Sequence, residues 1–184
     1  MRINAERFLL YRSGPGLAPA LLEREKQMQT RIAASAIIRV PAQQVYTILA
    51  DYHNGHSHIL PSQYFSDLHV EQGGIGAGTV IGFQMRVLGK TQTFRAAITE
   101  PEPGHVLVET NLPSGPVTTI AVDPNMGGQH AQVTITTELT VSNWLEGVFT
   151  KMLLHRIYVQ ELELLAAYAQ EQSLVGANMS TRLA

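Results

Sequence analysis

The chain has 184 residues, of which 45% are hydrophobic and 15% charged, and its formal net charge is -2. A chain of this size can bury a substantial core as one domain, and its charge gives no basic footprint for nucleic acid or for a membrane surface. It contains no cysteine, which excludes disulfides, thiolate catalysis and cysteine-ligated zinc. No apolar run approaches the roughly 20 residues that a membrane helix needs. We therefore expect a soluble, cytoplasmic protein.

The N-terminal segment differs from the rest of the chain. It contains the turn cluster Ser13-Gly14-Pro15-Gly16, followed by helix-forming residues after Pro19. We expect residues 1–29 to form an N-terminal arm that is partly helical or loosely ordered. A start of translation at Met28, just before the first strand, is an alternative explanation of this segment.

The first strand and helix signals follow the arm. Residues 31–40 alternate between apolar and polar side chains, which predicts a strand that ends at Pro41. Residues 42–51 predict a short helix with one apolar face. The loop that follows is rich in histidine, with His53, His56 and His58.

Six further strands are predicted, separated by turns rich in glycine or proline: residues 64–72, 79–88, 91–99, 106–110, 117–122 and 131–141. A tight turn at Gly89-Lys90 joins two of them as a hairpin. Short turns between consecutive strands imply antiparallel pairing. Each strand has one polar face, so one side of the sheet faces solvent and the other must be covered.

The last long segment, roughly Ser142 to Glu171, predicts an amphipathic helix that Ser142 can cap. Its apolar stripe follows alternating steps of three and four residues: Leu145, Val148, Met152, His155, Val159, Leu162 and Ala166. We expect this stripe to lie against the apolar face of the sheet, with a pocket between helix and sheet. His155 is the only member of the stripe that is not apolar.

These elements predict an α+β fold with the helix segregated to one face of the sheet. We expect a curved antiparallel sheet of about seven strands wrapped around the long C-terminal helix, with two short helices after the first strand. The predicted domain covers residues 30–172. Residues 173–184 are expected to form a flexible tail.

Three local patterns support a family resemblance: residues 38–51 (strand, proline and short helix ending at an aspartate), residues 71–79 (a glycine-rich turn) and residues 100–107 (a proline-rich turn). In this order and spacing they resemble the helix-grip fold of the START-like, SRPBCC superfamily, which includes polyketide cyclases and lipid-transfer domains. The resemblance covers about residues 31–170. It implies a ligand-binding domain but no universal catalytic residue. Many relatives carry tryptophans where this chain has the histidine-rich loop.

The expected ligand-binding residues face the space between sheet and helix: Phe83, Met85, Phe94, Ile98, Ile120, Ile135, Met152 and His155, with His58 at the pocket mouth. Plain core packing is the alternative for each apolar residue. The argument for a cavity is collective, because a strongly curved sheet over one helix leaves space for an apolar ligand.

His155 is the candidate catalytic residue, since a histidine in a cavity can orient a ligand or move a proton. The alternative is a structural histidine bonded to a carbonyl or hydroxyl, and a helix register shifted by one would place Arg156 inward instead. His53, His56 and His58 are weak candidates for a metal site. We expect no metal and no cofactor.

Three functions remain open from the sequence. The first is binding of a small hydrophobic or aromatic ligand of the lipid, isoprenoid or polyketide class. The second, implied by the resemblance, is a polyketide cyclase- or dehydratase-like enzyme that uses a pocket histidine as acid or base. The third is an interaction or chaperone-like module without a small ligand. The sequence does not decide whether the protein is an enzyme or a homodimer, and we expect neither nucleic acid binding nor membrane insertion.

Overall fold

The computed structural model describes residues 28–87 and 89–182, with side chains as far as residue 176. Most of the expected N-terminal arm therefore lies outside the described residues, and Met28 and Gln29 belong to the first strand. The elements in chain order are β1 (Met28–Ile38), α1 (Ala42–Ala50), the 3-10 helix η1 (His56–His58), β2 (Phe65–Gln72), β3 (Val80–Val87), β4 (Lys90–Glu102), β5 (Val106–Asn111), β6 (Val117–Asn125), the 3-10 helix η2 (Met126–Gly128), β7 (His130–Val141) and α2 (Trp144–Arg182).

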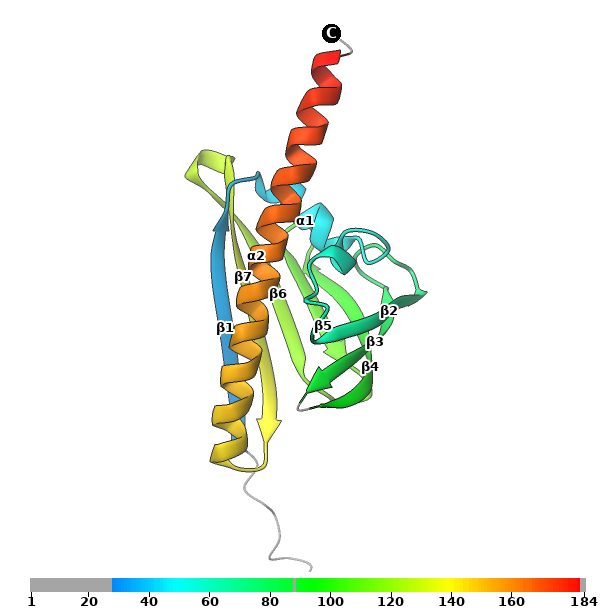
Figure 1. The fold of residues 1–184 in the computed structure, drawn as a ribbon, viewed down its shortest axis with the longest axis vertical. Helices are drawn as coiled ribbons and strands as arrows, with labels where there is room; N and C mark the ends of the chain where they lie inside the picture. Colours follow the sequence, from blue (N-terminus) through cyan, green and yellow to red (C-terminus); the bar gives the residue numbers. More distant parts are fainter. Residues whose placement is uncertain (1–27, 88, 183–184) are drawn as a thin grey trace, which may run out of the picture.

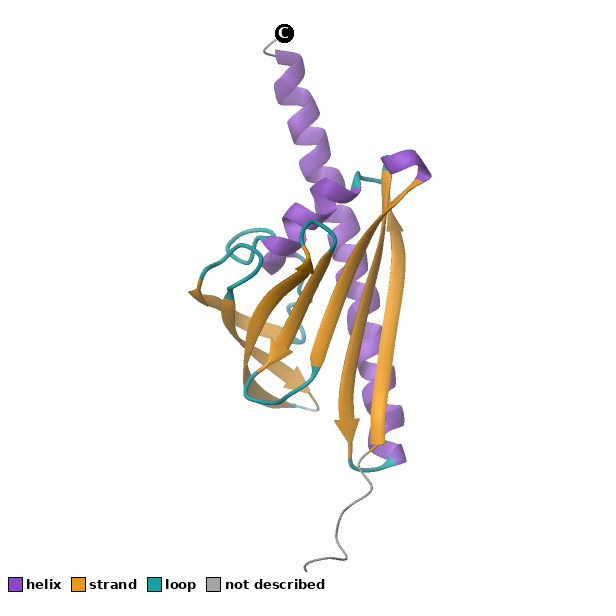
Figure 2. Ribbon diagram, turned by 180° about the vertical axis from the view of Figure 1, so that it is seen from behind, coloured by secondary structure: helices purple, strands orange, loops and turns teal. Residues whose placement is uncertain are grey.

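All seven strands form one antiparallel sheet in the order β1-β7-β6-β5-β4-β3-β2. The first strand pairs with the last, with Met28 opposite Val141, and β2 occupies the other edge of the sheet. The chain between β1 and β2, which contains α1 and η1, crosses one end of the sheet from edge to edge. Figure 1 shows α2 along one side of this curved sheet, and Figure 2 shows the strands from behind. The predicted helix-grip architecture is confirmed.

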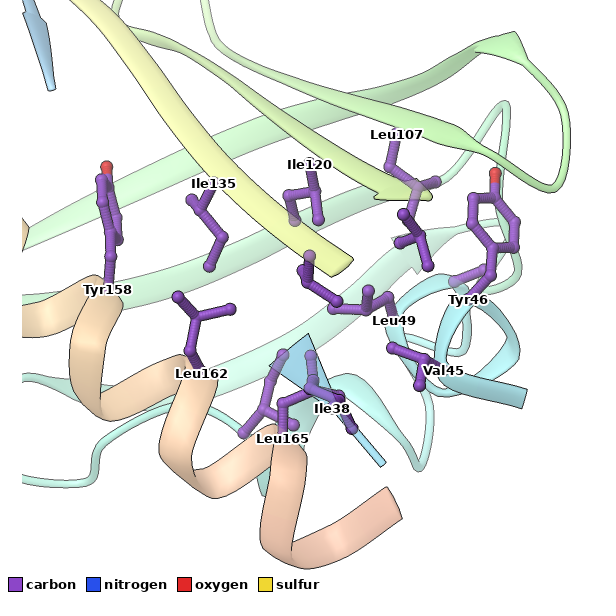
Figure 3. Close-up of a cluster of buried hydrophobic side chains, with 14 of the residues drawn as sticks. Ile38, Val45, Tyr46, Leu49, Leu107, Ile120, Ile135, Tyr158, Leu162 and Leu165 are labelled. Carbon is purple, nitrogen blue, oxygen red and sulfur yellow. The ribbon is translucent and has the colours of Figure 1, made fainter. Parts of the chain in front are cut away.

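The core lies where α1 and α2 pack on the sheet. Figure 3 shows Leu162 and Leu165 of α2 pointing toward the side chains of the sheet and of α1. Ile38, Leu49 and Leu165 are fully buried. Burial of apolar area of this kind is the main source of folding free energy.

The face of α2 that packs on the sheet differs from the predicted stripe. Five residues of that stripe are exposed and are called here the outer stripe: Leu145, Val148, Met152, His155 and Val159. The residues that face the sheet and α1, called here the inner face, are Leu154, Ile157, Tyr158, Glu161, Leu162 and Leu165. The centres of the two sets lie roughly 130° apart around a helix of 3.6 residues per turn. The prediction that His155 and Met152 face the sheet is therefore wrong, and Arg156 is exposed as well.

The ends of α2 also differ from the prediction. Asn143, rather than Ser142, caps the helix: its Oδ1 accepts a hydrogen bond of 3.0 Å from the backbone N–H of Glu146. Glu146 in turn accepts a bond of 2.9 Å from the backbone N–H of Ser142. At the other end the helix continues to Arg182, so residues 173–182, expected as a tail, are helical and project beyond the sheet (Figure 1). No proline interrupts this segment. None of the described helices has an apolar stretch long enough to cross a membrane.

Candidate ligand-binding cavity

A cavity of about 180 Å³ lies between the central strands, β2, η1 and α2. Its wall is mostly apolar. Five residues that the sequence predicted to contact a ligand line it: Phe83, Met85, Phe94, Ile120 and Ile135. Ile98 is buried in the core, outside this lining. The cavity has the position that the strand alternation predicted, because its sheet wall consists of inward-facing residues.

Aromatic rings form the wall at the β2–β4 end of the cavity. The rings of Phe83 and Phe94, opposite each other on β3 and β4, have centroids 5.5 Å apart and are stacked. Phe65 of β2 adds a tilted ring 6.0 Å from Phe83. Offset and tilted rings at these distances attract one another, and their faces offer a flat apolar surface to a planar ligand.

Glu109 of β5 is the centre of a polar cluster on the cavity wall. Its Oε1 accepts a hydrogen bond of 2.6 Å from the hydroxyl of Tyr52 and lies 3.6 Å from Nε2 of His56. His56 is buried, and its Nδ1 lies 2.9 Å from the carbonyl oxygen of Leu49. A carbonyl oxygen only accepts, so Nδ1 carries a proton and Nε2 faces Glu109. The three side chains form one connected unit.

The loop after α1 holds this unit in place. The Asp51 carboxylate accepts bonds of 3.0 Å from the backbone N–H groups of His53 and Asn54. The backbone N–H of Tyr52 donates to the carbonyl of Gly74 at 2.9 Å, and the Tyr52 ring stacks on the His56 ring with centroids 4.4 Å apart. The loop is thus fixed to the turn before β3, and its rigidity orients two of the three polar side chains.

Glu161 of α2 is the second carboxyl group on the cavity wall. Its side chain is almost entirely buried, and it makes no hydrogen bond to any other residue in the described part of the chain. Burial raises the pKa of Glu161 well above its ordinary value, and the negative charge of Glu109 adds to this effect. The neutral acid, which can donate a hydrogen bond, is therefore the favoured form of Glu161.

Two more polar groups reach the cavity. The side-chain oxygen of Asn111, at the end of β5, is buried and has no hydrogen-bond partner within the described ranges. Thr137 links the hydroxyls of Thr118, 2.7 Å away, and Tyr158. Burial raises the pKa of Tyr158 to about 12, so this hydroxyl stays uncharged. The cavity therefore combines satisfied hydroxyls with two groups, Asn111 and Glu161, that lack partners.

Most of the histidines predicted as site residues lie outside the cavity. His155 is exposed on α2, and His58 stacks on Tyr168 outside the cavity lining. His53 contacts the carbonyl oxygen of Gly73 at 3.3 Å. Only His56 of the loop lines the cavity. Across residues 28–87 and 89–182 no three histidine, aspartate or glutamate side chains lie close enough to hold a metal ion.

Glu109, Asn111, Tyr158 and Glu161 were not predicted as site residues. For β5 a signal existed: strand alternation places Glu109 and Asn111 on the same face as the buried Leu107. For α2 the signal was weaker. Tyr158 and Glu161 are three residues apart and share a face with Leu165. A helix face defined by its apolar residues does not include either of them.

A curved antiparallel sheet gripping a long helix, with a mostly apolar cavity between them, is a START-like ligand-binding fold. Three solved structures have a similar fold. The KanY protein is 24% identical, with a TM-score of 0.69 over 78% of this chain and 99% of its own. The Zhui aromatase/cyclase from Streptomyces sp. R1128 is 16% identical, with a TM-score of 0.62 over 79% of this chain and 96% of its own. A START superfamily protein from Mycobacterium smegmatis is 10% identical, with a TM-score of 0.63 over 77% and 98%.

The sequence itself identifies the family. The chain belongs to the family described as "Polyketide cyclase / dehydrase and lipid transport", whose model matches residues 29–170. A comparison with curated protein sequences found no match. At identities below 25% the solved structures establish the fold alone, so the function must be argued from the cavity.

Proposed function

We propose that the protein binds a small, uncharged aromatic molecule that carries a hydroxyl or ketone group. The observation that carries this proposal is the pair of unpartnered polar groups, Glu161 and the Asn111 side-chain oxygen, in an otherwise apolar cavity. The family includes polyketide cyclases by its description, and the Zhui protein is an aromatase/cyclase, which supports this ligand class.

The size of the cavity favours one or two fused rings. In another protein an apolar cavity of about 150 Å³ binds benzene, and this cavity measures about 180 Å³. A ring between Phe83 and Ile135 would gain both burial and stacking. A long acyl chain would exceed this volume, which favours the aromatic class over lipids and isoprenoids.

The polar groups favour an uncharged ligand with hydrogen-bonding capacity. A buried polar group without a partner costs about 1–3 kcal/mol, and a ligand that pairs with Glu161 or Asn111 removes this cost. The neutral carboxyl of Glu161 can donate to a ketone or phenol oxygen, and the Asn111 oxygen can accept from a hydroxyl. A ligand carboxylate, by contrast, would meet Glu109, so anionic head groups are disfavoured.

Three matched probes test this proposal: 2-naphthol, naphthalene and 2-naphthoate, titrated against the protein by ligand-observed NMR. We expect 2-naphthol to bind about five- to tenfold more tightly than naphthalene, because one net hydrogen bond contributes about 1 kcal/mol. We expect 2-naphthoate to bind most weakly. Ile135→Phe, which fills the cavity, should abolish binding, and Met152→Phe on the outer stripe should not. Equal affinity for all three probes, or binding unaffected by Ile135→Phe, would contradict the proposal.

A further inference from the structure

We infer that the cavity also catalyses proton transfer at the carbon beside a ketone, with Glu161 as the acid at the carbonyl oxygen and Glu109 as the base. This inference rests on the proposed function, because the ketone must first occupy the cavity. It adds an activity, keto–enol tautomerisation, and a substrate class, small ring-fused ketones with a hydrogen on the adjacent carbon.

The two carboxyl groups on the cavity wall, Glu109 and Glu161, have different environments. Oε1 of Glu109 accepts a hydrogen bond of 2.6 Å from the Tyr52 hydroxyl and lies 3.6 Å from Nε2 of His56. The hydrogen bond from Tyr52 holds the Glu109 carboxyl group in one orientation. Glu161 has no donor among the described residues and is buried with Glu109 as its charged neighbour. Two carboxyl groups in unlike environments on one wall are the pattern of an acid and a base.

The Glu109 carboxyl group has one oxygen available to accept a proton. Its Oε1 is engaged by Tyr52, and its Oε2 has no hydrogen bond within residues 28–87 and 89–182. Nε2 of His56 faces the same carboxylate, while Nδ1 is held by the Leu49 carbonyl. His56 is a positioning residue: its fixed ring lies beside the Glu109 carboxyl group and limits where that group can move.

The other titratable groups on the cavity wall set the electrostatic environment of Glu161. They are Glu109 from β5, His56 from η1 and Tyr158 from the same helix, and Thr118 and Thr137 add neutral hydroxyls to this wall. None of the lysines and arginines within residues 28–87 and 89–182 lines the cavity. Glu109 is thus the only other carboxyl group of this lining, and His56 is its only histidine.

The proposed step is balanced without any further reactant. The bond between the α-carbon and its hydrogen breaks, and the proton goes to Glu109. The electron pair of that bond forms the carbon–carbon double bond of the enol, while the carbonyl π electrons take the proton of Glu161. The reverse step returns a proton to carbon. In D₂O the carboxyl groups exchange their protons with solvent, so the returning particle is a deuteron.

The test uses 1-tetralone, a neutral ring-fused ketone close to 2-naphthol in size. Deuterium uptake at its α-carbon is followed by mass spectrometry in D₂O, with and without protein. We expect the wild type to accelerate uptake above the buffer rate. Glu109→Gln and Glu161→Gln should each lower that acceleration by about 10²-fold or more, in the range of general acid–base catalysis. Glu163→Gln, an exposed carboxylate two residues away on α2, is the matched control and should keep the wild-type rate.

Binding is measured on the same samples, by NMR titration of 1-tetralone and of 2-naphthol, so that the two proposals can fail separately. Wild-type protein that binds 1-tetralone but exchanges it at the buffer rate would overturn the inference alone. Variants at Glu109 and Glu161 that bind and still exchange at the wild-type rate would do the same. A wild-type protein that binds neither probe would overturn the proposed function and the inference together. His56→Gln should lower the rate with little loss of ketone binding, as a positioning residue would.

Discussion

The inner face and the outer stripe of α2 are both mostly apolar, but they differ in burial. The outer stripe is the more apolar of the two, yet Leu145 is 62% and Met152 65% exposed. The inner face contains Tyr158 and Glu161, and both are buried. A helix face that borders a cavity can therefore include polar groups. An apolar stripe on a helix indicates a contact surface, but the stripe alone does not identify the element that it contacts.

The largest expected effect comes from replacing one leucine on each side of the helix with alanine. Leu165→Ala on the inner face should lower the free energy of unfolding by about 2–5 kcal/mol, because it leaves a void in a packed core. Leu145→Ala on the outer stripe should change it by less than about 0.5 kcal/mol. Urea denaturation measures both. Equal losses would mean that the outer stripe is covered in solution.

The buried carboxyl offers a second test, through pH. The unfolded Glu161 carboxyl ionises near pH 4.5, whereas the folded one keeps its proton to higher pH. As pH rises above 4.5 the unfolded state binds fewer protons than the folded state, so Glu161 contributes a loss of stability that grows until the folded carboxyl ionises. The slope is at most about 1.4 kcal/mol per pH unit.

Glu161→Gln removes that slope. We expect the variant to gain stability relative to wild type between pH 5 and pH 8, measured by urea denaturation at each pH. Glu163→Gln, on the exposed side of the same helix, should run parallel to wild type. If the plots of unfolding free energy against pH were also parallel for Glu161→Gln and wild type, the Glu161 carboxyl would have an ordinary pKa. The inner face would then be accessible to solvent.

The smallest expected effect belongs to Trp144, the only tryptophan of the chain. It lies at the start of α2 and is 63% exposed. Its fluorescence should therefore have the long-wavelength maximum of a solvated indole, open to acrylamide quenching, and should shift by only a few nanometres on unfolding. A blue-shifted maximum that moves strongly on unfolding would show that another surface, for example a second copy of the chain, covers this end of the outer stripe.

Much of the fold was predictable because its signals are local. Alternation along β7 placed Val133 and Ile135 on the buried face, and the glycine turn before Lys90 gave the hairpin of β3 and β4. Period two leaves only two choices for a strand, and turn residues fix the register between neighbours. These rules needed no knowledge of distant contacts.

The orientation of α2 and the polar part of the cavity were not predictable in this way. A helix has a continuous range of rotations, and the choice between two stripes depends on how the sheet curves beneath it. Pairing of Glu109 with Tyr52 joins residues 57 positions apart, which no spacing pattern records. His56 was noticed as one of three loop histidines, but only the packing of that loop distinguishes it from His53 and His58.

The order of the strands has a consequence for how the molecule folds. Because β1 pairs with β7, the sheet cannot close until nearly the whole domain has been synthesised. Such long-range pairing raises the relative contact order and slows folding. The cavity draws on β2 through β7 and on α2, so it is among the last features to form. A ligand therefore meets a binding site only in the finished domain, and a chain arrested before α2 would expose the sheet face on which that helix lies.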